Sequence, residues 1–180
     1  YKTVFYTLGT LQIVLGVFML IPVIIQLIYG ELDSGFISAS IITIVFGVLF
    51  FLSNLDHDKN IDLPQAFILT ALSWLSVAIF GSLPFIFSEL NLKFTDAFFE
   101  SMSGITTTGS TIITDLDNAP KGILLWRAIL QWLGGIGIIL MAITLMPIMN
   151  IGGMQLFKIS SNDNAEKILP KSKEVSLRLI

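Results

Sequence analysis

One short run of small polar residues, Thr106-Thr107-Thr108-Gly109-Ser110, carries the chemistry that this sequence offers most plainly. A cation that leaves water needs its hydration shell replaced, and rings of neutral backbone carbonyls can do this while still letting the ion depart. Glycine lets the backbone bend so that successive carbonyls face inward. The run is therefore interpreted as a cation-coordinating segment. The alternative is an extracellular turn, rich in Thr and Gly, that joins two membrane spans.

The elements that hold this run belong to a membrane protein. Hydrophobic residues make up 54% of the chain and charged residues 13%, against about 25% charged in ordinary soluble domains. A membrane-spanning helix needs about 20 mostly apolar residues. The sequence predicts four spans, at Thr3–Tyr29, Phe36–Leu52, Gln65–Phe87 and Ile123–Met149, of which the first two form an antiparallel hairpin.

A short helix is predicted from Asp96 to Gly104, with Thr95 as its N-cap. At about 15 Å it reaches only half-way across the hydrocarbon core. Irregular backbone at that depth survives only where protein buries it or where it lines a watery cavity. The predicted fold is therefore an all-α integral membrane protein, in which an N-terminal helix pair precedes a span, the half-helix, the Thr/Gly run and a further span.

Two charged residues lie near the predicted filter. An unpaired charge at membrane depth is costly, so we expect Glu100 to support the filter, paired with Arg127 or with filter amides. The alternative for Glu100 is an exposed carboxylate near the outer interface. Arg127 lies about one turn into the fourth span, where it can equally extend to that interface without a partner.

Three glycines in the fourth span, Gly134, Gly135 and Gly137, predict close helix packing, because small residues let helix backbones approach in membranes. No strand precedes them, so a dinucleotide-binding loop is rejected. The chain has no Cys and a single His, His57. Neither a Cys-based nor a multi-His metal site is possible, and the filter segment offers no nucleophile–base pair. We expect no enzyme activity.

Lys and Arg placement predicts the topology. Lys2, Lys59 and the basic tail fall on one side of four spans, so the N-terminus and the tail are expected in the cytoplasm, with the half-helix entering from outside the cell membrane. Three parts are predicted: residues 1–63 as the helix pair and a cytoplasmic loop, 64–150 as the pore repeat, and 151–180 as a link to a second repeat. Because the chain begins at Tyr1 and ends in a new apolar rise, we expect a longer polypeptide.

Two separate motifs carry a resemblance to a known family. Residues 97–109 (AFFESMSGITTTG), followed by residues 125–137 (LWRAILQWLGGIG), resemble the Trk/Ktr/HKT superfamily of potassium transporters, and most closely its TrkH-type membrane subunit. Members of that superfamily resemble a tetrameric potassium channel folded into one polypeptide of four repeats. The resemblance implies that this chain holds an N-terminal helix pair and then only the first repeat, which consists of helix, pore helix, filter and helix.

The resemblance also implies roles for individual residues. The carbonyls of Thr107 and Thr108 would coordinate K⁺, with Gly109 as the filter glycine and Thr106 and Ser110 as neighbours. K⁺ would be the transported ion, with no covalent cofactor. The filter lacks the longer Thr-Val-Gly-Tyr-Gly sequence of potassium channels, so selectivity would rest on fewer carbonyl layers.

The partners implied by the resemblance are the remaining pore repeats of the same polypeptide, a second copy in a homodimer, and a cytosolic nucleotide-binding regulatory subunit. No nucleic acid is expected. Two alternatives to a potassium uptake subunit stay open, because one filter segment cannot surround an ion. They are a non-conducting membrane scaffold or assembly subunit, and a homotetrameric cation channel.

Overall fold

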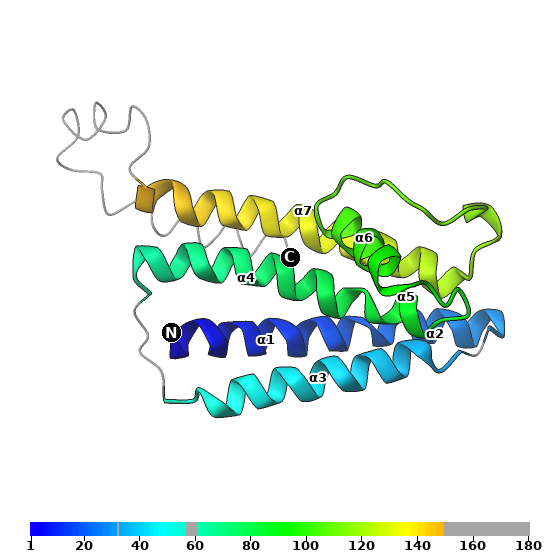
Figure 1. The fold of residues 1–180 in the computed structure, drawn as a ribbon, viewed down its shortest axis with the longest axis horizontal. Coiled ribbons are helices and arrows are strands. Elements are labelled where there is room, and N and C mark those ends of the chain that lie inside the picture. Colours follow the sequence, from blue (N-terminus) through cyan, green and yellow to red (C-terminus); the bar gives the residue numbers. More distant parts are fainter. Residues whose placement is uncertain (32, 57–60, 150–180) are drawn as a thin grey trace. The chain divides into compact units, whose positions relative to one another are not determined.

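The computed structural model describes residues 1–31, 33–56 and 61–149, and the regular structure in these ranges is entirely helical (Figure 1). Its α-helices are α1 (Lys2–Phe18), α2 (Leu20–Tyr29), α3 (Gly35–Ser53), α4 (Leu63–Gly81), α5 (Leu83–Phe87), α6 (Phe94–Ile105) and α7 (Lys121–Met149), with a 3-10 turn at Leu116–Asn118. Within these ranges, four segments are long and apolar enough to cross a membrane: Lys2–Tyr29, Gly35–Ser53, Pro64–Phe87 and Lys121–Ile143. The predicted all-helical membrane architecture is confirmed.

Two of these four segments are interrupted, and a proline that follows each break in the sequence accounts for it. Proline has no N–H, and its ring clashes with the carbonyl four residues earlier. Pro22 accounts for the break between α1 and α2 at Met19, and Pro84 for the break between α4 and α5 at Ser82. The break at Met19 lies about one turn before Pro22.

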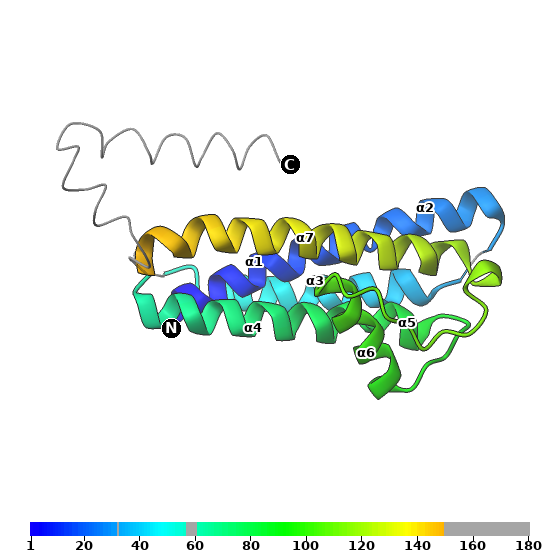
Figure 2. The ribbon, with the colours of Figure 1, turned by 90° about the horizontal axis from the view of Figure 1, so that it is seen from above.

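Helices α1 and α3 form the predicted antiparallel hairpin, and they pack closely because small residues line their interface (Figures 1 and 2). A Cβ on Gly9 would lie 2.6 Å from the Phe51 backbone nitrogen. Further along, the Ser40 hydroxyl donates to the Gly16 carbonyl at 2.7 Å. Side chains larger than these would push the two helices apart.

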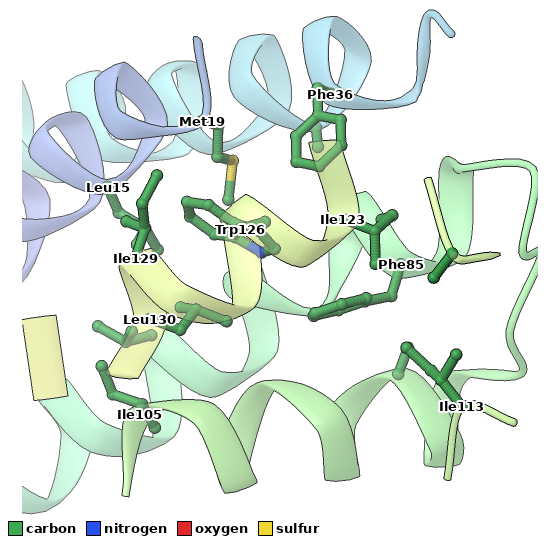
Figure 3. Close-up of a cluster of buried hydrophobic side chains, with 14 residues drawn as sticks. Leu15, Met19, Phe36, Phe85, Ile105, Ile113, Ile123, Trp126, Ile129 and Leu130 are labelled. Carbon is green, nitrogen blue, oxygen red and sulfur yellow. The ribbon is translucent and has the colours of Figure 1, made fainter. Parts of the chain in front are cut away.

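Trp126 of α7 lies at the centre of the buried core, among side chains from α1, α3 and α5 (Figure 3). Its indole N–H donates to the Gly81 carbonyl at 2.9 Å, and its ring meets that of Phe36 edge-on at 6.3 Å. The helix break supplies this acceptor: the Phe85 N–H donates to Ser82 instead of to Gly81. Trp126 thus ties α7 to the end of α4.

The chain divides into two compact units, residues 1–134 and residues 135–180, and the division falls inside α7. The N-terminal helix pair, α6 and the first part of α7 all belong to the first unit. The predicted boundaries after residues 63 and 150 stay predictions. Residues 151–180 and His57 lie outside the described ranges.

Candidate functional site: the half-helix and the segment that follows it

Helix α6 is longer than predicted, with 12 residues from Phe94 to Ile105. It buries one face, whose spacing matches a helical period: Ala97, Glu100, Ser101 and Gly104. The helix begins two residues before the predicted Asp96, because the Lys93 carbonyl accepts from the N–H groups of Asp96 and Ala97. Lys93 is therefore the N-cap, and the prediction of Thr95 as N-cap was wrong. The Thr95 hydroxyl lies 3.5 Å from Asp96 Oδ1.

Glycines on α4, α6 and α7 let the half-helix lie close to its neighbours. A Cβ on Gly81 would lie 2.6 Å from Ser101 Oγ, and one on Gly104 would lie 3.0 Å from Leu130 Cβ. A Cβ on Gly134 would overlap the carbonyl of Ile105, the last residue of α6. The end of the half-helix therefore rests directly on the backbone of α7.

The segment that follows α6 folds back over the helix end. The Thr107 N–H donates to the Gly104 carbonyl at 2.9 Å, and the N–H groups of Thr108 and Gly109 both donate to Ser103, at 3.0 and 3.3 Å. The first two bonds form a Schellman motif, in which the residue after the C-cap is left-handed and is usually glycine. Here that residue is Thr107, at φ 58°.

This hydrogen bonding fixes where the carbonyls point. In a trans peptide, the C=O of one residue is antiparallel to the N–H of the next, and the described chain has no cis bond. Since three successive N–H groups turn back toward α6, the carbonyls of Thr106, Thr107 and Thr108 point away from it. Among the described residues, none donates a hydrogen bond to the carbonyl of Thr107 or Thr108.

The side chains of the same segment are exposed in this chain, from Thr106 to Ser110. The Thr106 hydroxyl donates to the Met102 carbonyl at 2.7 Å and lies 3.0 Å from the Thr108 hydroxyl. Gly109 is left-handed at φ 76°, and a Cβ on it would have only the Gln131 side chain within 4 Å. Carbonyl oxygens and threonine hydroxyls, all neutral, are thus available on one exposed strip.

Glu100 and Arg127 are brought together beneath this strip. Glu100 is 1% exposed, and its Oε2 lies 3.1 Å from Arg127 Nε. Its Oε1 accepts from the Thr111 hydroxyl and from the Ile112 N–H, both at 2.6 Å. Arg127 also makes a long contact, 3.5 Å, from Nη2 to the Gly109 carbonyl. The ion pair neutralises a buried charge. It also contacts the segment on both sides of Ser110, at Gly109 through Arg127 and at Thr111 through Glu100.

A second link, one helical turn further along α6, was not predicted from the sequence. The Ser103 hydroxyl donates to the Ser110 carbonyl at 2.7 Å. Ser103 follows Glu100 by three residues, so both side chains leave the same side of α6. That spacing is the signal by which Ser103 could have been found. No comparable signal marks Thr111 and the Ile112 N–H, because their partner is fixed only when the chain turns back.

The predicted residues therefore fall into two groups. Thr106–Ser110, Glu100, Arg127 and Gly134 meet around the end of α6. Gly135 and Gly137 belong to the second unit, and their role in helix packing stays a prediction. Among the described residues, no group of His, Cys, Asp or Glu is arranged to hold a metal ion. The ligands that this site offers are backbone and hydroxyl oxygens.

Comparison with known proteins identifies relatives of this chain. The family described as TrkH, cation transport protein, matches residues 33–179. The Trk system potassium uptake protein TrkI of Halomonas elongata is 40% identical over 92% of this chain and 34% of its own length. The Trk system potassium uptake protein TrkH of Escherichia coli is 38% identical over 88% of this chain and 33% of its own length.

A solved structure shares the fold. The crystal structure of the potassium transporter TrkH from Vibrio parahaemolyticus superimposes with a TM-score of 0.82 at 31% sequence identity, and the match covers 99% of this chain and 36% of that one. The chain thus spans about one third of the length of the relatives it matches.

Proposed function

Because the chain belongs to the TrkH family of cation transport proteins, we propose that it is the N-terminal portion of a subunit that takes up K⁺ across the cell membrane. The relatives from Halomonas elongata and Escherichia coli are both named as potassium uptake proteins. The four membrane-capable segments among the described residues support a multi-pass membrane protein. Enzymatic activity and covalent cofactors form no part of the proposal.

The proposed mechanism is coordination of dehydrated K⁺ by the carbonyls of Thr107 and Thr108, with Thr106, Gly109 and Ser110 completing the filter segment. The observation that carries it is the direction of these carbonyls, which follows from the return of three successive N–H groups to α6. Neutral carbonyls replace the hydration shell without trapping the ion. Gly109 supplies the left-handed turn that ends the segment.

Glu100 and Arg127 act in this mechanism as filter support. The Glu100 carboxylate belongs to a residue that is 1% exposed, and it contacts Thr111, Ile112 and Arg127. These contacts hold the segment after α6 at a fixed distance from the helix. A fixed segment keeps the filter carbonyl oxygens at the spacing that suits one ion. The ion pair thus contributes to ion preference through geometry, and it does not touch the ion.

One chain of this length supplies one filter segment, and an ion needs oxygens on all sides. The proposed partners are therefore the remaining repeats of the same polypeptide, with a homodimer and a cytosolic nucleotide-binding subunit as further assembly. We place the N-terminus and the C-terminal tail in the cytoplasm. In the second unit, Gly135 and Gly137 are proposed to pack against neighbouring helices.

Uptake of K⁺ by cells that lack their own uptake systems tests the function. The full-length protein carrying Gly109→Ala should lose most K⁺ uptake, because a Cβ at φ 76° strains the segment although space around it is open. Thr95→Ala, a change at an exposed residue in the first turn of α6, should keep uptake. Normal uptake by Gly109→Ala, at equal amounts of protein in the membrane, would reject the filter.

A further inference from the structure

The carboxylate of Glu31, in the turn after α2, reaches across the first unit to the beginning of α7. Its Oε2 accepts from the Lys121 backbone N–H at 2.9 Å, although 90 residues separate the two in sequence. Lys121 is the first residue of α7, and the first N–H groups of a helix have no acceptor within it. Glu31 therefore supplies an acceptor, from outside the helix, for the N–H of the first helical residue.

The sequence before α7 explains why a distant side chain does this. Pro120 provides its carbonyl to the N–H groups of Ile123 and Leu124, at 3.0 and 3.1 Å. Neither Pro120 nor Ala119 has a side chain that can accept a hydrogen bond from the helix start, whereas Ser, Thr, Asp or Asn would. A negative charge also suits this end of the helix dipole. The cap comes from the N-terminal helix pair.

The end of α2 is built to aim Glu31. Gly30 is left-handed at φ 72°, and the Glu31 N–H returns to the Gln26 carbonyl at 3.0 Å. The Gln26 side chain, itself 2% exposed, lies directly under α7, where a Cβ on Gly122 would be 2.9 Å from its Cγ. Two consecutive residues of α7 thus rest on the last turn of α2 and on Glu31, two residues beyond it.

The same stretch of α7 carries the filter support. Arg127 lies six residues after Lys121, about 9 Å along the helix axis at 1.5 Å per residue. Between them, Trp126 is locked by the Phe36 ring of α3 and by the Gly81 carbonyl. Trp126 and the start of α7 are thus the two anchors of this stretch. Loss of the anchor at Lys121 would leave Trp126 alone to hold Arg127 in place relative to Glu100 and Gly109.

We propose that Glu31 is a positioning residue for ion preference: by capping α7 from the N-terminal helix pair, it keeps Arg127 in register with the filter segment. The inference rests on the proposed function, and it gives the N-terminal helix pair a role in selectivity. Glu31 does not touch the ion. Its effect is expected in the ratio of K⁺ to Na⁺ uptake and not only in the amount of folded protein.

The test removes each partner of the hydrogen bond separately in the full-length protein. Glu31→Leu removes the acceptor, whereas Glu31→Gln keeps an acceptor oxygen and serves as the conservative rescue. Lys121→Pro removes the donor at a helix position that tolerates proline, whereas Lys121→Ala keeps the N–H. Glu89→Leu is the control for loss of an exposed carboxylate. K⁺ and Na⁺ uptake are measured at equal amounts of protein in the membrane.

We expect Glu31→Leu and Lys121→Pro each to lower the K⁺/Na⁺ uptake ratio about threefold or more, in line with the loss of a helix cap, and the double variant to be no worse than either. Glu31→Gln, Lys121→Ala and Glu89→Leu should keep the wild-type ratio. If Glu31→Leu yields no protein, the two Lys121 variants decide. An unchanged ratio in Lys121→Pro, or additive losses in the double variant, would overturn the inference. A wild-type protein that takes up no K⁺ would instead overturn the proposed function.

Discussion

Thr107 holds a backbone conformation that suits it poorly. Left-handed φ, here 58°, costs an L-residue about 1–2 kcal/mol, and a β-branched side chain adopts it rarely. The Schellman motif at the end of α6 would be served better by glycine. Strain of this kind is found at functional sites. We propose that threonine at position 107 makes the backbone more rigid than glycine would, and so holds the Thr107 carbonyl in one direction at the expense of stability.

Replacing Thr107 by glycine should therefore stabilise the protein and harm its function. Thr107→Gly is expected to raise the free energy of unfolding by about 0.5–1 kcal/mol, since relief of strain exceeds the entropy that glycine adds to the unfolded chain. K⁺/Na⁺ discrimination should fall. Thermal melting of the purified full-length protein and paired uptake assays measure both effects.

Thr108→Gly is the matched control, because Thr108 is not left-handed. It should destabilise the protein by about 0.5–1 kcal/mol. If Thr107→Gly melts lower than wild type, the strain assigned to Thr107 is wrong.

The ion pair of Glu100 and Arg127 should behave as a unit. Glu100→Gln keeps an oxygen for Thr111 and Ile112 but leaves Arg127, whose side chain is 11% exposed, without its counter-charge. Breaking a buried pair from one side costs about 3–5 kcal/mol, whereas removing both charges costs much less. We expect Glu100→Gln and Arg127→Gln each to lower the melting temperature and uptake strongly.

The double variant Glu100→Gln/Arg127→Gln should recover part of the melting temperature lost by either single variant. Its K⁺/Na⁺ discrimination should stay low, because the contact to the Gly109 carbonyl is gone. Additive losses of stability would show that the two charges act independently.

At this scale, the sequence identified residues by type but not by contact. A charge at membrane depth calls for a partner, so the meeting of Glu100 with Arg127 could be foreseen as one option. The bond from Ser103 to Ser110 could have been found from helical spacing. The bonds from Thr111 and Ile112 could not, because they depend on how an irregular segment returns, and no periodicity encodes that.

Among the elements, the position of α6 depends on a direct backbone contact with α7, at a place where no side chain lies between the two helices. A Cβ on Gly134 would overlap the Ile105 carbonyl, and backbone cannot give way as a side chain can. The three atoms nearest to a Cβ on Gly122 all belong to the Gln26 side chain. Both glycines are buried on α7, so the two positions separate a backbone clash from a side-chain clash.

Gly134→Ala should therefore displace the end of α6 and abolish most K⁺ uptake, with a loss of stability of about 1–3 kcal/mol as in other overpacked sites. Gly122→Ala should cost less, because Gln26 can shift. Alanine gains about 1 kcal/mol of helix propensity at either position. Equal melting temperatures and equal uptake in the two variants would contradict the close contact between α6 and α7.

The elements themselves were largely predictable from the sequence. Long apolar runs predict the four spans, because the bilayer sets the length that a span requires. The segment of α6 is too short to be a span, and its sequence predicts a short helix. The ends were less certain. Thr95 is a good N-cap by type, yet the carbonyl of Lys93 begins the helix, since the chain enters the helix from an extended residue there. The break at Met19 precedes the proline that causes it.

Across the whole chain, the first compact unit joins the N-terminal helix pair to α6 and to the first part of α7. Composition and motif order indicated both parts. The sequence did not indicate that Glu31 would cap α7, because nothing local relates two residues 90 positions apart. The chain belongs to the TrkH family, as the order of its two motifs predicted.

The most direct test is the position of the ion. A structure of the full-length protein, solved with Rb⁺ or Tl⁺ in place of K⁺, would show the heavy cation by anomalous scattering. We predict a peak on the axis enclosed by the repeats, coordinated by the carbonyls of Thr107 and Thr108. A peak bound elsewhere, with these two carbonyls facing lipid or another part of the protein, would contradict the proposed filter.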